Sequence, residues 1–459
     1  MRSQLIGRIA LAIVGGLAGV ATVSWSSGQT PPPPRELPPN LKAFDVKSPP
    51  PVVQPVTGIN TGVAPKTMAP ALRATVAFDR FRNLQNVPEP TRQMVMSALI
   101  GMEWLHRYNQ PNGLFFHGYL PALNQPMEGD HFLHQAMATF VLARAARFTG
   151  DERYLVRANQ AVLTLLSGTI VEPSLPGVRR PVQPSVVCNR LAAASYLVMS
   201  IHELPDPAAD LVNKAEELCA YFRQHQREDG SLSTADSSSD GATTDADANQ
   251  YPGLALYALA LSQRGKTAEW KTLALKKAIG FYRKEFKQQP RPDFVPWMSA
   301  ACTESYLSTK DNISAEFLFE MNDWLCELQY EQSPDPRRPQ WRGGFKSVSD
   351  GKTATSRPGI EAALYAQSLA DACRMLRQMP SPDLARYERY RATLIRGLQF
   401  LETLQFTEAN SLHIAAGYRN MLVGGFHPTH ADGNLRIDQC AAGISAFIQF
   451  LVSGADRAR

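Results

Sequence analysis

The sequence predicts an all-α domain built from six helical hairpins. Apolar residues recur at spacings of three and four in twelve segments, and the links between these segments alternate between short and long. Nothing between the segments has the alternating apolar pattern of a strand. The twelve predicted helices are, approximately, 91–108, 130–149, 151–167, 186–202, 207–226, 250–264, 267–286, 297–309, 312–331, 357–378, 383–405 and 436–453.

The N-terminal segment, residues 1–30, is predicted to direct export. Arg2 and Arg8 flank the start of the uncharged apolar run from Ile9 to Val23, which is short for a membrane span. We therefore expect a signal peptide, with an uncleaved signal anchor as the alternative. The protein is expected in the periplasm or outside the cell, and the alternative adds a tether to the inner membrane.

Residues 31–87 are predicted to be a proline-rich, disordered linker, because the prolines at 31–34 and 49–51 remove backbone donors and favour polyproline II geometry. The helical domain would then span residues 88–459. The net charge of +5 is spread over the chain, which gives no argument for a nucleic-acid partner. The six cysteines lie in apolar helical patterns without close spacing, so most are expected to be buried thiols, although Cys302 and Cys326 could meet.

The alternating lengths of the links distinguish the two ends of the domain. Short turns follow every second helix, and the other links run to between about ten and thirty residues. If every long link follows the first helix of a hairpin, all long links lie at one end, together with the N-termini of the second helices. This loop-rich end is where chemistry is expected. The short turns are Thr149-Gly150-Asp151, Pro205-Asp206-Pro207, Gly265-Lys266 and Asp311-Asn312.

A repeated unit ends several first helices. An aromatic residue is followed by about one helical turn, a glutamine and then a glycine-containing return. The copies are Tyr221 to Gln226 before Gly230, Trp324 to Gln329 before Gly343-Gly344, and Phe400 to Gln405 before Gly424-Gly425.

With these repeats and the hairpin pattern, the chain resembles the (α/α)6 toroids over about its last 370 residues. That superfamily includes six-hairpin glycosidases, sugar epimerases and polysaccharide lyases, and a second branch of terpenoid cyclases and protein prenyltransferases. The resemblance implies a closed toroid with the second helices inside. Such motifs specify architecture far better than activity.

Polar and aromatic residues gather at the predicted starts of the inner helices. Aromatic faces stack on pyranose rings, while carboxylates and arginines bind hydroxyl or uronate groups. We therefore expect an exported protein that acts on an oligo- or polysaccharide, by hydrolysis first and by lyase or epimerase chemistry second, with no cofactor and no metal. These residues are Asp130, His131, His134, Asn189, Asp245, Asp247, Tyr251, Trp297, Glu304, Arg357, Glu361, Arg436 and Asp438.

Glycoside cleavage requires two carboxyl groups, one kept protonated and one ionised. Glu304 and Glu361 are the first candidates, because each sits in a segment otherwise suited to burial, and both are expected to face one cavity at the loop-rich end. An ion pair between neighbouring helices is the alternative for each. Asp247 and Asp438 are further candidates, and Asp247 could instead cap a helix.

The candidate substrate-binding residues are His131, His134, Tyr251, Trp297, Arg357 and Arg436. His131 and His134, at a spacing of three, could hold a metal only with a third ligand, and a general acid or base is as plausible. Arg436 could pair with a carboxylate at the mouth, and the alternative for the start of the last helix is closure of the ring.

Two motifs of the second branch are incomplete here. Asp245-Ala246-Asp247-Ala248 resembles the acidic motif of class II terpenoid cyclases but has Ala at the final Asp position. Asp438-Gln439-Cys440 resembles the zinc ligands of protein prenyltransferases, yet no histidine follows.

Two other classes remain open beside the carbohydrate-active one. A non-catalytic envelope binding or scaffold protein predicts Glu304 and Glu361 in ion pairs far apart. An isoprenoid enzyme predicts a deep cavity lined by aromatic residues and few charges.

Overall fold

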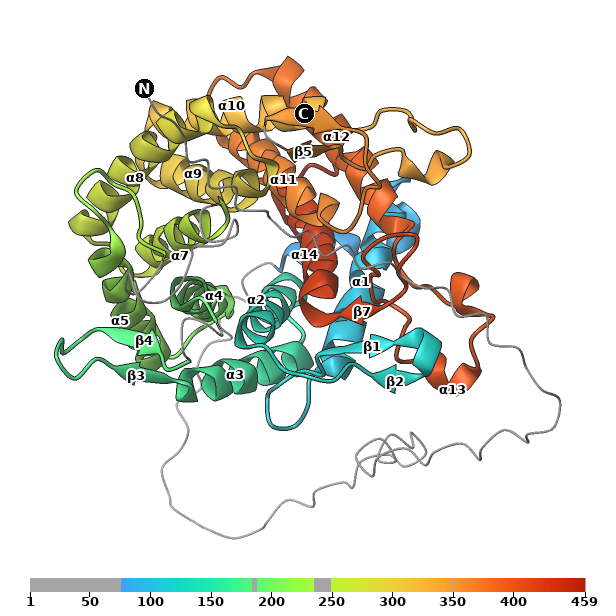
Figure 1. The fold of residues 1–459 in the computed structure, drawn as a ribbon, viewed down its shortest axis with the longest axis horizontal. Coiled ribbons are helices and arrows are strands. Elements are labelled where there is room, and N and C mark those ends of the chain that lie inside the picture. The colour runs from blue at the N-terminus through green and yellow to red at the C-terminus, as the bar shows by residue number, and fades with distance from the viewer. Residues whose placement is uncertain (1–75, 184–187, 235–248, 350, 459) are drawn as a thin grey trace, which may run out of the picture. The chain divides into compact units, whose positions relative to one another are not determined.

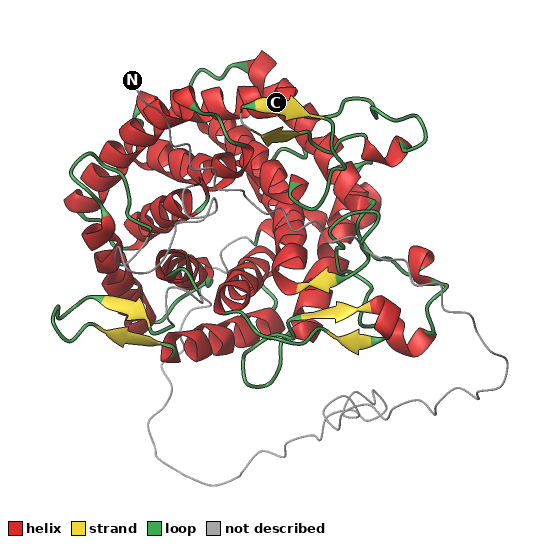
Figure 2. Ribbon diagram, in the orientation of Figure 1, coloured by secondary structure: helices red, strands yellow, loops and turns green. Residues whose placement is uncertain are grey.

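The computed structural model describes residues 76–183, 188–234, 249–349 and 351–458. The predicted signal segment lies outside these residues, as does most of the predicted linker. Figure 2 shows a chain that is mostly helix, with short strands in the loops. Every predicted helical segment is a helix: α1 Thr91–Tyr108, α2 Phe132–Thr149, α3 Glu152–Ser167, α4 Arg190–Glu203, α5 Ala209–His225, α7 Tyr251–Gly265, α8 Glu269–Gln288, α9 Val295–Thr309, α10 Asn312–Glu327, α11 Ala362–Gln378, α12 Leu384–Glu402 and α14 Ile437–Ser453.

The helices form two concentric rings (Figure 1). The inner ring runs α2, α4, α7, α9, α11, α14, each helix contacting the next, and contact between α14 and α2 closes it. Helices α1, α3, α5, α8, α10 and α12 lie outside. The predicted (α/α)6 toroid is therefore confirmed.

Sequence composition explains which helices lie inside. The inner helix α4 is buried without interruption from Leu191 to Ile201, because small and apolar residues cover its whole circumference. The outer helix α3 buries a single stripe, with Tyr154, Ala158 and Leu165 inward and exposed polar residues on the opposite face. An element that is apolar all round is stable only between other elements, so the second helix of each hairpin forms the inner ring.

The short turns lie at one end of the toroid. Helix α2 ends at Gly150, which has a φ of 67°, and the side chain of Asp151 caps the next helix. Asp311 and Asp383 cap α10 and α12 in the same way. Because these turns are tight, the long loops and the inner-helix N-termini share the other end.

In all three copies of the repeated unit, the glutamine fastens the long loop to the next outer helix. Gln329 donates from Nε2 to the carbonyl oxygens of Gly343 at 3.0 Å and Thr393 at 2.9 Å, the latter in α12. Gln405 repeats this arrangement with Gly424 and, in α1, Ser97. The last loop is thereby attached to the first helix. Gln226 contacts Gly230 and, in α8, Ala274.

Short strands lie in the loops, so the prediction that none occurs between the helices is wrong for the described residues. Strands of two or three residues are too short to show a periodic pattern. β1 pairs with β7 and thereby joins the first long loop to the last. The strands are β1 Gly118–Leu120, β2 Gln125–Pro126, β3 Thr169–Val171, β4 Arg179–Pro181, β5 Ser347–Ser349, β6 Lys352–Ala354 and β7 Leu435–Arg436.

The chain folds against the toroid before Pro88. The 3-10 helix at Ala77–Phe81 places Phe78 and Phe81 against Phe148 near the end of α2, with ring centroids 5.6 and 6.4 Å apart. These residues fall in the stretch that the sequence assigned to the linker.

All six cysteines are buried and unpaired, and Cys302 and Cys326 form no disulfide. Across the described ranges, no helix is both long and apolar enough to cross a membrane.

Candidate functional site at the loop-rich end

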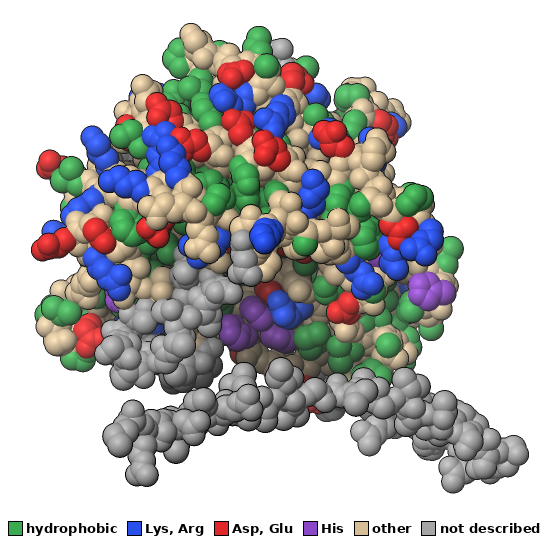
Figure 3. All heavy atoms as spheres, turned by 45° about the horizontal axis from the view of Figure 1, so that its top comes forward, with side chains coloured by type: hydrophobic (Ala, Val, Ile, Leu, Met, Phe, Trp, Pro, Cys, Tyr) green, Lys and Arg blue, Asp and Glu red, His purple; other side chains and the backbone are tan. Residues whose placement is uncertain are grey.

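Three histidines lie together at the loop-rich end. His117 precedes β1, His131 is the N-cap of α2 and His134 lies in its first turn. The His134 ring stacks on His131 at a centroid distance of 4.4 Å and on His117 at 5.4 Å. We call these residues the histidine cluster. Figure 3 shows histidines beside basic and acidic side chains at a hollow in the surface.

Asp438, in the first turn of α14, joins the histidine cluster to Arg436. The guanidinium of Arg436 donates to both carboxylate oxygens, at 2.6 and 2.8 Å, and Oδ2 lies 3.8 Å from Nε2 of His134. Burial opposes ionisation of Asp438, but Arg436 and His134 outweigh burial and lower its pKa. Burial lowers the pKa of His134 to about 4, although Asp438 acts in the opposite direction. A neutral imidazole therefore lies beside an ionised carboxylate at neutral pH.

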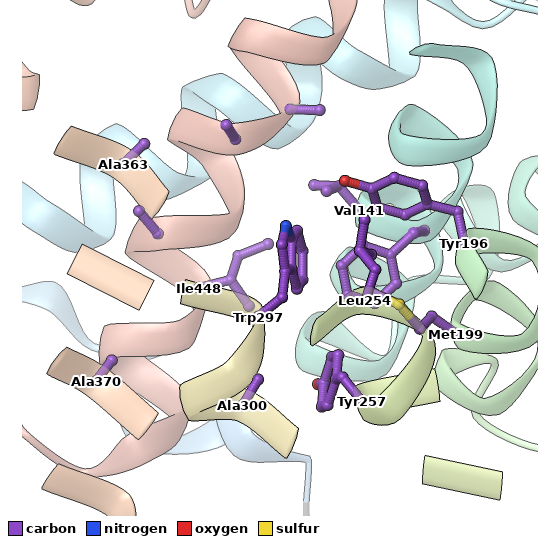
Figure 4. Close-up of a cluster of buried hydrophobic side chains, with 14 of the residues drawn as sticks. Val141, Tyr196, Met199, Leu254, Tyr257, Trp297, Ala300, Ala363, Ala370 and Ile448 are labelled. Atoms are coloured by element: carbon purple, nitrogen blue, oxygen red, sulfur yellow. The ribbon is translucent and has the colours of Figure 1, made fainter. Parts of the chain in front are cut away.

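Aromatic side chains of the inner helices pack together in a group that we call the aromatic floor. Trp297, in the first turn of α9, contacts Tyr196 at a centroid distance of 5.8 Å and stacks on Tyr257 at 6.1 Å. Figure 4 shows these rings on the inner helices beside Val141 and Leu254. Burial, with smaller effects of Tyr251 and Asp438, raises the pKa of Tyr196. Trp297 is 4% exposed and belongs to the core.

Glu361 lies at the start of α11, the inner helix between α9 and α14. Its Oε1 accepts a hydrogen bond from the backbone N–H of Gly359 at 2.7 Å. Although Glu361 is exposed, the surrounding protein raises its pKa by desolvation, and the negative charge of Asp293 adds to this effect. Glu361 is therefore a solvent-accessible carboxyl group with a raised pKa.

Asp293 and Tyr365 support this carboxyl group. Tyr365, one turn after Glu361, donates from its hydroxyl to Oδ1 of Asp293 at 3.1 Å. Sequence reasoning missed Asp293, because it began this helix at Trp297 and left Asp293 in a loop. In the structure Asp293 belongs to the short 3-10 helix Pro292–Phe294 that leads into α9. Its place directly before an inner helix is the signal that could have identified it.

The loop before α14 lies against the start of α11, because the N–H of Ile360 donates to the carbonyl of Pro428 at 2.8 Å. This loop carries His427 and His430. The pKa of His430 is lowered to about 4 by burial, with smaller effects of His427 and Arg357. Arg357 is exposed at this rim, so the structure places the predicted substrate-binding arginine near the mouth.

Glu304 does not lie where the sequence predicted. It is near the C-terminal end of α9, and the N-terminus of that helix is at the loop-rich end, so Glu304 lies toward the short-turn end. Its carboxylate is 3% exposed and pairs with Arg264 of α7 and Arg374 of α11. Burial raises its pKa, but the two arginines outweigh burial and lower it. The expectation that Glu304 and Glu361 face one cavity is wrong, and Glu304 instead forms the alternative ion pair between helices.

The remaining predicted residues divide into three groups. Tyr251 begins α7 at the mouth, half-buried, and its electrostatic effect on Tyr196 places it near the aromatic floor. Asn189 caps α4 by accepting from the N–H of Ala192 at 3.0 Å, a structural role. Asp247 lies outside the described residues, as does Asp245.

Two further features of the described residues concern metal ligands and the central cavity. Within the ranges that the structure describes, no three His, Cys, Asp or Glu side chains are placed to hold a metal ion. At the centre of the toroid, Trp297, Tyr257, Arg144 and Asp371 line a cavity of about 10 Å³. This space is too small for an isoprenoid chain, so it is not the deep cavity that the isoprenoid hypothesis requires.

The closed inner ring and the outer ring of helices define the fold as a six-hairpin (α/α)6 toroid. No known protein-family model matches the sequence, and no curated protein matches it in sequence. Solved structures with this fold include the α-1,6-mannanase GH76A of a Salegentibacter species, with a TM-score of 0.56 and 12% identity over 78% of this chain and 99% of that one. Cellobiose 2-epimerase from Bacillus thermoamylovorans gives 0.57 and 9%, over 79% and 98%. An unsaturated glucuronyl hydrolase specific for heparin gives 0.52 and 13%, over 78% and 96%. At these identities the likeness is one of fold.

Proposed function

We propose that the protein is an exported glycoside hydrolase whose active site lies at the loop-rich end of the toroid. The observation that carries this proposal is the pair of carboxyl groups at the starts of the neighbouring helices α11 and α14. Glu361 has a raised pKa and Asp438 a lowered one. Two carboxyl groups whose surroundings separate their pKa values are what acid-catalysed glycoside cleavage requires.

In this mechanism Glu361 donates a proton to the glycosidic oxygen as the bond to the leaving sugar breaks. Asp293 is a positioning residue, because its charge, oriented by Tyr365, favours the protonated form of Glu361. Asp438, kept ionised by Arg436, acts on the other side of the sugar as base or nucleophile. The histidine cluster provides rings and hydrogen-bonding groups for a pyranose ring, while the buried aromatic floor supports the helices that carry the site.

A second candidate is sugar epimerisation or isomerisation, and the histidine cluster is the observation that favours it. Neutral His134 beside ionised Asp438 could take a proton from a carbon next to a carbonyl group. The two reactions differ in product, since hydrolysis makes new reducing ends and epimerisation does not.

The solved neighbours agree with a carbohydrate substrate. A variant of the mannanase with two aspartates changed to asparagine is described as inactive and was solved with α-1,6-mannotriose. D-mannose isomerase shares the same fold, with a TM-score of 0.56 and 11% identity, covering 80% of this chain and 99% of that one.

The test is product analysis on a panel of neutral and uronate-containing oligosaccharides. The purified protein is incubated with each, and new reducing ends, ultraviolet absorbance of unsaturated products and changes in sugar configuration are recorded. New reducing ends support hydrolysis. Unsaturated products or altered configuration without cleavage would replace hydrolysis by lyase or epimerase chemistry. Binding with no product at all would favour the scaffold function and contradict an enzyme.

The location is proposed from the N-terminal segment alone, which has an uncharged apolar run after Arg8. The N-terminal sequence and mass of the protein recovered from a cell-envelope fraction test both export and cleavage. An intact N-terminus in a membrane fraction would replace the cleaved signal by an anchor.

A further inference from the structure

A second cavity lies at the loop-rich end, away from the histidine cluster. It has a volume of about 410 Å³ and lies between the end of α8, the loop after α5 and the 3-10 helix before α9. We call it the rim pocket. Its volume is in the range of small-ligand sites. The lining residues on which the argument depends are Arg227, Phe281, Tyr282, Glu285, Arg291 and Phe294.

One wall of the rim pocket is aromatic. The rings of Tyr282 and Phe294 lie 5.8 Å apart, and Phe281 packs edge-on to Tyr282 at 5.1 Å. The hydroxyl of Tyr282 is already engaged, because it accepts from the N–H of Leu232 at 2.9 Å. These rings are therefore held in place before any ligand arrives, which lowers the entropic cost of binding.

Arg291, which also lines the pocket, carries a hydrogen-bond donor without an acceptor among the described residues. Nε of Arg291 is enclosed by protein and has no partner among the described residues. An enclosed donor with no acceptor is unfavourable, and the guanidinium to which it belongs lines the pocket, where it can donate to a ligand oxygen. Glu285 offers an exposed carboxylate on the same pocket.

The charges of the pocket balance. Asp229 also lines it, and its carboxylate accepts from the N–H and hydroxyl of Ser231 at 2.9 and 2.7 Å. The positive charge of Arg227 contributes to lowering the pKa of Asp229, after those hydrogen bonds. Two arginines, Arg227 and Arg291, and two carboxylates, Asp229 and Glu285, line the pocket, so it has no net charge to favour an anion.

The rim pocket and the proposed active site are linked by the segment from Arg291 to Phe294. Arg291 and Phe294 line the pocket, and Asp293 lies between them in the sequence. Asp293 in turn accepts from Tyr365 and acts electrostatically on Glu361. A glycan with one unit at Glu361 could therefore place a neighbouring part of its chain in the pocket.

We propose that the rim pocket is a subsite for a neutral pyranose unit of the substrate, stacked on the wall formed by Phe281, Tyr282 and Phe294 and hydrogen-bonded to Arg291. This inference rests on the proposed function and names its substrate class, a neutral oligosaccharide that extends beyond the unit at Glu361.

Binding by isothermal titration calorimetry tests the subsite. The protein carries Glu361→Gln in all cases so that the ligand persists. The probes are neutral manno-, cello- and malto-oligosaccharides of two and four units, and trigalacturonate. Arg291→Met is compared with Arg337→Met, which removes an exposed guanidinium outside the pocket. Phe281→Ala provides a second change in the pocket should Arg291→Met fail to fold.

We expect Arg291→Met to weaken binding of a neutral tetrasaccharide at least tenfold and to leave binding of the disaccharide unchanged. The Arg337→Met control should bind both ligands as tightly as the parent protein. Unchanged tetrasaccharide binding, equal loss for both lengths, binding of trigalacturonate only, or no binding of any probe would overturn the subsite. Turnover of the ligand by the Glu361→Gln protein would instead refute Glu361 as the acid, and the comparison of affinities would still assess the pocket.

Discussion

Oδ2 of Asp438 lies 3.8 Å from Nε2 of His134, yet the histidine is neutral at pH 7. Burial accounts for this, because it lowers the pKa of His134 more than the neighbouring carboxylate raises it. The negative charge of Asp438 is compensated mainly by Arg436, through two hydrogen bonds. The site thus holds one ion pair, between Arg436 and Asp438, and one neutral imidazole, that of His134.

Arg436→Gln should lower the free energy of unfolding by about 1 kcal/mol at pH 7, a modest value because the arginine side chain is 39% exposed. The folded pKa of Asp438 is lowered, so its contribution is complete above its unfolded pKa of about 4 and is lost as the pH falls through the folded value. Urea unfolding at pH 7, 5 and 3 should give equal differences at pH 7 and 5 and a smaller one at pH 3. A difference that grows on acidification would contradict this assignment.

Glu402→Gln should stabilise the protein in alkaline solution. Burial, with a smaller effect of Glu89, raises the pKa of Glu402 to about 7, and its Oε1 has no partner among the described residues. A raised carboxyl pKa means that wild-type stability falls as the pH rises from about 4.5 through 7. We expect the variant to be more stable by up to about 3 kcal/mol at pH 8.5 and equally stable at pH 4. Glu408→Gln, at an exposed position, is the control, and a gain that is independent of pH would refute the explanation.

The repeated return after the outer helices can be tested at Gly343. This residue has a φ of 89°, and a Cβ there would lie 2.1 Å from the carbonyl oxygen of Arg396 in α12. Gly343→Ala should destabilise by about 3 kcal/mol or more, because both backbone strain and a clash with backbone oppose it. Gly351→Ala shares the positive φ, at 72°, but meets nothing within 4 Å, so it should cost only about 1 kcal/mol. Equal losses of thermal stability in the two variants would show that the contact with α12 is unimportant.

The helices and their order could be predicted from the sequence because each is long and strongly periodic. The alternation of link lengths also placed the inner-helix N-termini at one end, and the repeated glutamine marked real contacts, as Gln329 and Gln405 show. The strands could not be predicted, since two or three residues carry no period. Their position is set by pairing between β1 and β7, which are more than 300 residues apart in sequence.

The site was predicted less well, because sequence shows that a carboxylate is buried but not along which part of a helix its partners lie. Glu304 and Glu361 both looked like acids in apolar segments. In the structure Glu304 meets Arg264 and Arg374, which come from two other helices, whereas Glu361 meets a backbone N–H and the charge of Asp293. Only the three-dimensional arrangement separates these two cases.

Glu304→Gln should reduce the free energy of unfolding by about 3 to 5 kcal/mol, because it leaves the buried Arg374 without its anionic partner on α9. Glu316→Gln is the matched control, since that carboxylate also pairs with an arginine, Arg283, but is 59% exposed. The control should change stability by no more than about 1 kcal/mol in urea unfolding. A similar small change for Glu304→Gln would contradict the structural role assigned to this ion pair.

The most direct test of the central claim is kcat/KM of Glu361→Gln beside Glu304→Gln, corrected for the folded fraction, on the oligosaccharide that the product analysis identifies. If the chemistry lies at the loop-rich end, Glu361→Gln should lose at least about 100-fold with its thermal stability retained, while folded Glu304→Gln stays within about threefold of wild type. Full activity in Glu361→Gln, or a 100-fold loss confined to folded Glu304→Gln, would place the chemistry elsewhere and contradict the account.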